Sequence, residues 1–451
     1  MKKIISLFTA LCLCMTAAAC KNDTPDDGAY NISGSVPEGQ ATVTQSPTPE
    51  NPGIPPEADY EQLVKRLGEQ MANGEFSEVT KLFSDTVKAS LPETSLSLAW
   101  AQTVADAGDY IGYYDTTIDE SNGMTTVVSL LEFSETGLCI TYYFGTDGKI
   151  EGLWLRCQTL AKNTETEHYT ETAVVIGSYE LNGLLTLPKD IKHPPIVILI
   201  QGSGPSDMDE TVNDSKPFRD IAHGLAENGV AVLRFNKRFY QHPEAADTVT
   251  IQTEVLDDVT AAIDYASACS GVDSGRIYLL GHSLGGMLVP VLAGETSAVK
   301  GIISLAGTPR KLEDIICDQN NYLLKAGGLS DDMIEAQMQP VLEEAAKIKN
   351  LTEDDRGSYF GVNAEYWYSL NRLDTATAAQ ALEIPMLFLQ GSEDIQVYAD
   401  VDFAEWQEIL KGKSNCTFHL YEGLGHFFVG DDGFVDANVI EDIAAFILNN
   451  E

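Results

Sequence analysis

The sequence predicts two folded parts of different class. The C-terminal part is an α/β domain with a doubly wound, mostly parallel sheet, and a small α+β domain precedes it. The first prediction rests on a β-rich apolar run at 276–280, which leads through a glycine-rich turn into a buried helical pattern at 286–293. Further strand-like runs lie at 195–200 and 384–390. The second prediction rests on helical spacing of apolar residues, followed by strand runs with hairpin turns.

Residues 1–20 have the organisation of a signal peptide. A charged start precedes an apolar run at 4–15 that is too short to span a bilayer, and small residues at 17–19 precede Cys20. Cleavage before a cysteine resembles a bacterial lipoprotein signal, which implies a lipid anchor on Cys20. Ala17 stands where such signals usually have Leu, so simple secretion is the alternative. We expect an exported protein that is anchored to the cell envelope as a lipoprotein.

The segment 21–57 is rich in Pro, Thr, Ser, Asp and Gly, and we expect a disordered tether. The next part, 58–160, is the small α+β domain. It opens with apolar residues at helical spacing and continues with four strand runs at 110–118, 124–133, 138–144 and 150–155. Asn122-Gly123 and Asp147-Gly148 are hairpin turns between strands. The pattern resembles cystatin-like α+β modules and contains no catalytic constellation, so we expect a packing or interaction domain.

The most informative motif is Gly281-His282-Ser283-Leu284-Gly285, a G-x-S-x-G sequence between a strand run and a helical pattern. A serine on such a sharp turn holds its hydroxyl out of the sheet, because small neighbours allow the backbone to bend tightly. We therefore predict Ser283 as a nucleophile. The alternative is a small-residue turn without chemistry.

A serine nucleophile needs a base, and the base needs an orienting acid, in the chain order Ser, acid, His. Only His419 and His426 lie late enough. His419 falls inside a strand run, whereas His426 lies in a glycine-bearing loop after it, so His426 is the predicted base. The predicted acid is Asp394, which follows the strand run 384–390, and Glu393 is the alternative.

Two backbone N–H groups are needed to stabilise the oxyanion of an acyl-transfer reaction. One is expected from Leu284, directly after the nucleophile. The other is expected from Ser203, in the Gln201-Gly202-Ser203-Gly204-Pro205 loop after the strand run 195–200. A plain tight turn is the alternative for this loop.

These residues give 165–451 a resemblance to the α/β-hydrolase superfamily, within it to bacterial esterases and serine-aminopeptidase-like proteins. The resemblance implies a Ser283, Asp394, His426 triad and hydrolysis of carboxylic esters. Met208 and Asn236 depart from the pattern, which usually has Arg and Asp there, and put substrate contacts in doubt. The similar stretches are 201–207, 216–222, 233–238 and 281–286.

Helical sequence at about 308–382 interrupts the pattern before the acid-bearing strand and predicts a lid. Aromatic residues cluster there at 359–360 and 366–368. Two hypotheses remain open for them: they line an apolar acyl pocket, or they only pack the core of the lid.

The composition limits the classes of binding partner and cofactor that are expected. With 28 basic and 68 acidic residues the net charge is −40, which disfavours nucleic acid and anionic membrane surfaces. Of the cysteines beyond Cys20, Cys139 and Cys157 face each other across a predicted hairpin, and a disulfide there depends on the strand register. No zinc or calcium motif occurs, so we expect no metal and no cofactor.

The sequence as a whole predicts a serine hydrolase that cleaves small-molecule esters of short-to-medium acyl chains. The membrane is a partner only through the lipid on Cys20. A peptidase or acyl-peptide hydrolase is the alternative within enzymes. From another class, the alternative is a surface binding protein on a silent hydrolase scaffold.

Overall fold

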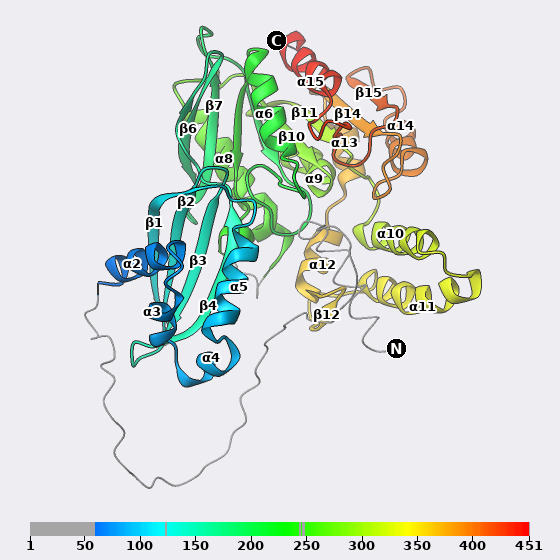
Figure 1. The fold of residues 1–451 in the computed structure, drawn as a ribbon. Coiled ribbons are helices and arrows are strands. Elements are labelled where there is room, and N and C mark those ends of the chain that lie inside the picture. Colours follow the sequence, from blue (N-terminus) through cyan, green and yellow to red (C-terminus); the bar gives the residue numbers. More distant parts are fainter. Residues whose placement is uncertain (1–58, 122–123, 243–244, 246–248, 451) are drawn as a thin grey trace. The chain divides into compact units, whose positions relative to one another are not determined.

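The computed structural model describes residues 59–121, 124–242, 245 and 249–450. The predicted signal peptide, Cys20 and the predicted tether lie outside these residues. The described chain forms two compact units, one ending at Leu160 and the other beginning at Ala161 (Figure 1). No helix of the described residues combines the length and the apolar character that crossing a membrane requires.

The first unit consists of short helices and a four-stranded antiparallel sheet. Strand order in the sheet is β1-β2-β3-β4, so each strand pairs with its neighbour in sequence. Leu67, Phe83, Leu131 and Ile140 belong to one buried cluster that joins helices to sheet, which is why the helical spacing and the strand alternation both appear in the sequence. The elements are α2 (Tyr60–Ala72), α3 (Phe76–Lys81), α4 (Asp85–Ser90), α5 (Glu93–Thr103), β1 (Tyr110–Ser121), β2 (Met124–Phe133), β3 (Gly137–Phe144) and β4 (Ile150–Gln158).

The register of β3 and β4 decides the disulfide question. Leu138 pairs with Cys157 and Cys139 pairs with Arg156, so the two cysteines are offset by one residue. An offset of one residue turns side chains to opposite faces of a sheet. Cys139 is accordingly buried and Cys157 exposed, and no disulfide joins them.

The second unit is built on a nine-stranded sheet with the order β15-β14-β11-β10-β8-β9-β7-β6-β5. The six strands from β15 to β9 run parallel, and β7, β6 and β5 continue the sheet in antiparallel fashion. This is the α/β-hydrolase fold. The strands are β5 (Thr164–Glu165), β6 (Tyr169–Ile176), β7 (Leu181–Pro188), β8 (Ile196–Ile200), β9 (Ala231–Phe235), β10 (Ile277–His282), β11 (Val299–Leu305), β14 (Met386–Gly391) and β15 (Cys416–Tyr421).

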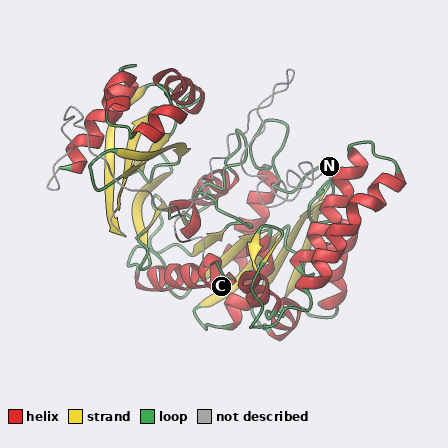
Figure 2. Cartoon of the chain, turned by 90° about the horizontal axis from the view of Figure 1, so that it is seen from below, coloured by secondary structure: helices red, strands yellow, loops and turns green. Residues whose placement is uncertain are grey.

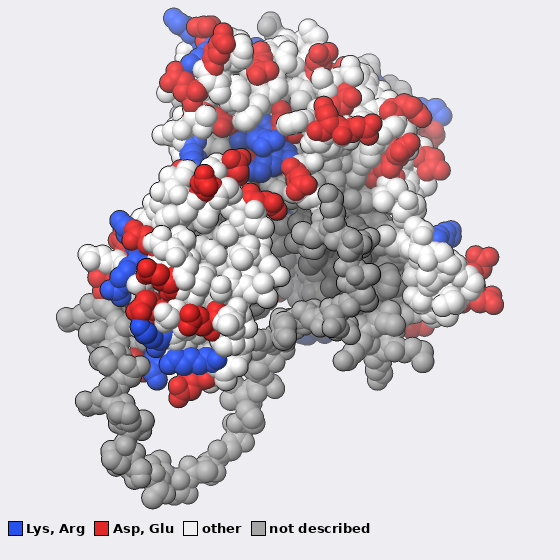
Figure 3. Space-filling view, viewed as in Figure 1, with Lys and Arg blue, Asp and Glu red and all other residues white. Residues whose placement is uncertain are grey.

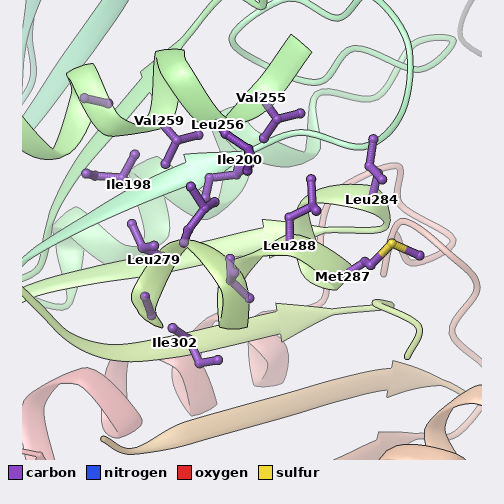
Figure 4. Close-up of a cluster of buried hydrophobic side chains, with 14 of the residues drawn as sticks. Ile198, Ile200, Val255, Leu256, Val259, Leu279, Leu284, Met287, Leu288 and Ile302 are labelled. Carbon is purple, nitrogen blue, oxygen red and sulfur yellow. The ribbon is translucent and has the colours of Figure 1, made fainter. Parts of the chain in front are cut away.

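Helices cover both faces of this sheet (Figure 2). On one face, α6 (Pro217–Glu227) and α15 (Ala437–Asn449) form a buried cluster with alternate residues of the parallel strands. On the other face, α8 (Asp257–Ala268) and α9 (Leu284–Gly294) pack on the remaining alternate residues, among them Ile198 and Leu279 (Figure 4). The inner parallel strands are therefore mostly apolar, because both of their faces are buried, whereas the edge strand β15 is partly exposed.

The region predicted as a lid contains four helices and a two-stranded hairpin. Phe360, Tyr366 and Trp367 are buried in the same cluster as α8 and α9, which favours packing as the role of these aromatics. The Trp367 indole N–H donates to the carbonyl of Tyr359 over 2.8 Å. The elements are α10 (Leu312–Ala326), α11 (Asp331–Ile348), β12 (Ser358–Tyr359), β13 (Val362–Asn363), α12 (Ala364–Asn371) and α13 (Thr375–Ala381).

Acidic side chains cover more of the face drawn in Figure 3 than basic side chains do, in keeping with the net charge of −40. A surface of one dominant sign repels other anions over about 8–10 Å at physiological salt. Several charged residues are nevertheless buried, among them Arg234, Lys237 and Asp394.

Candidate active site

Ser283 stands between β10 and α9 in a strained backbone conformation, with φ 54° and ψ −115°. The fold permits this turn only with glycines nearby. A Cβ on Gly281 would lie 2.2 Å from the backbone of Gly285, and one on Gly285 would lie 2.3 Å from the carbonyl oxygen of Ile200. The sequence thus specifies a nucleophile elbow, in which the N-terminal end of α9 points toward the serine.

His426 and Asp394 are in direct contact. His426 Nδ1 lies 2.7 Å from Asp394 Oδ2, and both side chains are almost fully buried. The carboxylate also accepts hydrogen bonds from the Gln390 side chain at 2.9 Å and from the amides of Gln396 and Val397 at 2.8 and 3.0 Å. Burial raises the pKa of Asp394, but the charge of His426 and these hydrogen bonds outweigh it and hold that pKa below its usual value. The acid is therefore ionised and fixed in orientation.

The two alternatives from the sequence are placed elsewhere. Glu393 is exposed to solvent. His419 lies within β15, where its Nδ1 contacts Asp442 Oδ2 at 2.8 Å near the surface. Neither residue contacts Asp394 or His426 through its side chain in the described structure.

His282, the residue before Ser283, links the turn that carries Ser283 to the loop that carries His426. His282 Nε2 lies 3.0 Å from the backbone carbonyl of His426, so its N–H donates there. Among the described residues, the Ser283 hydroxyl makes no hydrogen bond, and the contact between Ser283 Oγ and His426 Nε2 is not formed. Such hydrogen bonds are often long before substrate binds.

The loop 201–205 lies against Ser283, since a Cβ on Gly202 would be 3.2 Å from Ser283 Cβ. The amides on either side of Ser203 are occupied: Gly202 N–H donates to Glu210 at 2.7 Å, and Gly204 N–H donates to Glu254 at 2.9 Å. In the described part of the chain, no acceptor is found for the Ser203 N–H. That amide and the amide of Leu284, the first residue of α9, are thus available to an oxyanion.

Buried charges that the sequence motifs did not single out hold this loop. Lys237 Nζ lies 2.7 Å from the Gly202 carbonyl oxygen and 2.6 Å from Glu254 Oε1. Lys237 and Glu254 are each about 5% exposed or less. Glu254 also affects Tyr366. Burial first, and the nearby charge of Glu254 second, raise the pKa of the Tyr366 hydroxyl well above its usual value. The segment 233–238, which contains Lys237, is one of the stretches that resemble the family. The contacts of Lys237 with Gly202 and Glu254 could not be predicted, because these residues come from segments far apart in the chain.

The two departures from the family pattern contact each other. The Met208 N–H donates to Asn236 Oδ1 at 2.9 Å, and both residues are at most 1% exposed. Met208 packs on Ala161 and Leu184. These residues therefore occupy the interior of the unit, where the Asn236 side chain binds the backbone of Met208.

A cavity of about 310 Å³ lies beside α9. Its lining includes Met287 and Leu288, one turn beyond Ser283, but not the three predicted triad residues. The rest of its wall comes from the loop after β11 and from the segment between α12 and α13. These residues are Pro309, Arg310, Lys311, Leu312, Leu370, Asn371, Arg372, Leu373, Asp374 and Thr375.

Sequence comparison gives two family matches. A family described as "Serine aminopeptidase, S33" matches residues 211–433, which include Ser283, Asp394 and His426. A family described as "Protein of unknown function (DUF3887)" matches residues 65–153. Esterase EstD of Thermotoga maritima is 31% identical over 407 residues, which cover 86% of this chain and 95% of that protein.

Two solved structures are similar to parts of this chain. Est1E from Butyrivibrio proteoclasticus is 20% identical with a TM-score of 0.42, over 62% of this chain and 98% of that chain. A puromycin-hydrolyzing peptidase of Mycobacterium tuberculosis is 17% identical with a TM-score of 0.42, over 75% of this chain and 48% of that chain.

Proposed function

Because the chain belongs to the serine aminopeptidase S33-like family of α/β-hydrolases and is a serine ester hydrolase related to Esterase EstD, we propose that Ser283, His426 and Asp394 carry out its reaction. One observation carries this proposal. The 2.7 Å contact between His426 and Asp394 lies at the C-terminal edge of the parallel strands, and the elbow after β10 and the loop 201–205 after β8 lie at the same edge.

The first half-reaction transfers the acyl group to the enzyme. His426 Nε2 takes the proton from Ser283 Oγ as that oxygen attacks the ester carbonyl carbon. The N–H groups of Ser203 and Leu284 stabilise the tetrahedral oxyanion. The oxyanion collapses, the bond to the alkoxide breaks, and the alkoxide leaves with the proton that His426 carried. The acyl group remains bound to Ser283 Oγ.

The second half-reaction uses water in the same way. His426 removes a proton from the water as it attacks the acyl-enzyme, and it returns that proton to Ser283 when the carboxylic acid leaves. Asp394 keeps the Nδ1–H tautomer and stabilises the imidazolium in both steps. The lowered pKa of Asp394 supports this role, since the ionised carboxylate supplies the negative charge that stabilises the imidazolium.

The proposed substrates are small esters of short-to-medium acyl chains. The relation to Esterase EstD supports an ester as the substrate. Comparing chromogenic esters of increasing chain length with aminoacyl anilides distinguishes an esterase from a peptidase. Faster turnover of the anilides would favour the peptidase.

The proposed export and lipid anchoring rest on the sequence of residues 1–20 alone. Labelling cells with a lipid precursor tests them. Wild-type protein is expected to take up the label and fractionate with membranes, whereas Cys20→Ala is expected to do neither. Labelled Cys20→Ala protein would exclude Cys20 as the anchor.

Labelling with a fluorophosphonate probe tests the nucleophile. Ser283→Ala removes one oxygen from a preformed turn, so the variant should fold, fail to label and lose on the order of 10⁴- to 10⁶-fold in kcat. Labelling that persists in this variant would move the nucleophile elsewhere. Wild-type protein that neither labels nor turns over esters would favour the binding-protein alternative.

A further inference from the structure

A second histidine–carboxylate pair lies beneath the nucleophile. His282 Nδ1 is 2.9 Å from Glu210 Oε1, and both side chains are about 4% exposed or less. Glu210 adopts a left-handed conformation with φ 51°, which is uncommon for a residue with a side chain. Neither residue is part of the proposed triad, and a buried pair without a role is costly to keep.

The hydrogen bonds define the protonation of this pair. A neutral imidazole has one N–H, yet both ring nitrogens of His282 face oxygen acceptors: Glu210 Oε1 and the carbonyl of His426. Glu210 Oε1 also accepts the Gly202 N–H at 2.7 Å. Among the described residues, Glu210 Oε2 has no hydrogen-bond partner, and His282 is the one ionisable group that contacts Glu210. The arrangement is that of an imidazolium–carboxylate ion pair.

The electrostatic surroundings agree with this assignment. Burial lowers the pKa of His282, but the charge of Glu210, its hydrogen bond, the carbonyl of His426 and the charge of Asp394 outweigh it, and the pKa is raised. The titratable groups that face His282 are Glu210 from the loop after β8 and His426 and Asp394 from the loops after β15 and β14.

The pair also connects the three parts of the active site. Glu210 binds the backbone of Gly202, in the loop of the second oxyanion donor. His282 is covalently joined to Ser283, and its other nitrogen binds the backbone of His426. A change in this pair therefore moves the oxyanion loop, the nucleophile and the base relative to one another.

We propose that Glu210 and His282 are positioning residues for ester hydrolysis, and that they act as a permanent buried ion pair which holds the oxyanion loop and the base loop against the nucleophile elbow. The proposal rests on the triad mechanism above, in which these three parts meet. The pair does not exchange protons with substrate, in contrast to His426.

Glu210→Gln tests the charge with little change in shape. Because Oε2 has no hydrogen-bond partner among the described residues, the glutamine can place its nitrogen there and keep its oxygen on the Gly202 and His282 donors. We expect kcat to fall about 10- to 100-fold with KM changed less than about threefold, because small misplacements of reacting groups cost up to about 100-fold in rate. His282→Gln is expected to show the same split.

Asp442→Asn is the matched control. It breaks the same kind of pair, His419 with Asp442 at 2.8 Å, away from the proposed site. Its kcat should stay within about twofold of wild type. Rates are divided by the number of sites that react with the fluorophosphonate probe, so that partial unfolding does not count as lost catalysis.

Nitrogen NMR on protein with ¹⁵N-labelled histidine supplies a readout that a purely structural role would not move. At pH 7.5 the folded wild type should show one histidine with both nitrogens protonated, which disappears in His282→Gln and becomes neutral in Glu210→Gln. A neutral His282 in the wild type, or Glu210→Gln with unchanged kcat, would overturn the inference. The wild-type spectrum alone tests whether His282 is doubly protonated, even if a variant fails to fold. Labelling of Ser283→Ala would instead overturn the proposed function.

Discussion

At the residue scale, Asp394 and Glu393 are chain neighbours with the same functional group in different surroundings. Asp394 is buried and accepts hydrogen bonds from His426, Gln390 and two backbone amides, whereas Glu393 is exposed. Two of these four donors are amides of the turn after β14, and the other two are the side chains of Gln390 in β14 and of His426 in the loop after β15. Burial alone would disfavour the charged form of Asp394, and the donors reverse that effect.

The first prediction compares these two acids. Asp394→Asn should lower kcat about 10⁴-fold, because an amide nitrogen facing Nδ1 favours the wrong imidazole tautomer. Glu393→Gln should change kcat by less than about twofold, since its side chain meets solvent. Steady-state kinetics on one short-chain ester measure both. A larger loss in the Glu393 variant would reverse the assignment of the acid.

A second cluster of buried charged side chains affects the stability of the fold at acidic pH. Arg234 lies between Glu171 and Asp209, at 2.8 and 3.0 Å, and all three side chains are at most 7% exposed. Burial raises the pKa of Glu171, but hydrogen bonds and charge from His223 and Arg234 lower it to about 2. The same balance of burial against Arg234 leaves the pKa of Asp209 below its usual value.

The second prediction follows from the sign of these shifts. A carboxyl group whose pKa is lower in the folded state stabilises the fold above its unfolded pKa, and that contribution is lost as pH falls through the folded value. Glu171 should therefore contribute up to about 3 kcal/mol at pH 6, declining between pH 4.5 and 2. Urea unfolding of wild type and Glu171→Gln should differ more at pH 6 than at pH 3.5. An equal difference at both values would contradict this account.

At the element scale, helix α12 is the informative part of the predicted lid. Trp367 is 0% exposed and contacts Phe360 and Tyr366 edge-on. Helix α13 is bound to α9, since the Thr375 hydroxyl donates to the carbonyl of Met287. Helices α12 and α13 are therefore packed into the body of the second unit. A lid that opens freely over an active site would lack such contacts.

The third prediction separates packing from substrate binding. Trp367→Leu should lower the free energy of unfolding by about 3 kcal/mol, because it leaves a cavity and removes the hydrogen bond to Tyr359. Chain-length preference on chromogenic esters should not change. Tyr368→Leu, at a partly exposed neighbour, is the control and should cost less than about 1 kcal/mol. Unchanged stability with altered chain-length preference would favour the acyl-pocket hypothesis.

At the scale of the whole molecule, each unit has its own core. The buried cluster of the first unit contains residues from Leu63 to Ile150, and the clusters of the second begin at Ala161. Every residue of the proposed reaction lies in the second unit. Ala161 packs there on Leu184 and Met208, so it marks the start of the chain that the hydrolase needs.

The fourth prediction is that a chain truncated to begin at Ala161 keeps its kcat on a small soluble ester. Separate cores allow separate folding. Circular dichroism confirms that the truncated chain is folded, and probe titration counts its active sites. A folded truncation with kcat reduced 100-fold or more, about 2.7 kcal/mol of transition-state stabilisation, would mean that the first unit completes the active site.

The sequence by itself determined what depends on local spacing. The elbow motif needs small residues at 281 and 285 because backbone lies within 2.3 Å of any Cβ there, and that requirement is visible in one chain segment. The strand runs that precede Ser203 and Asp394 were also visible, because parallel strands buried on both faces are mostly apolar. A serine hydrolase of the α/β class follows from these local signals and their order along the chain, and ester hydrolysis follows from the family resemblance that they carry.

Only the tertiary structure decided which side chains meet. Glu210 and His282 are 72 residues apart, and Asp394 and His426 are 32 apart, so no spacing rule links either pair. The one-residue offset of Cys139 and Cys157 and the burial of Trp367 depend in the same way on register and packing. A buried charge is stable only when its partner and hydrogen bonds are in place, and those are supplied by the fold rather than by neighbours in sequence.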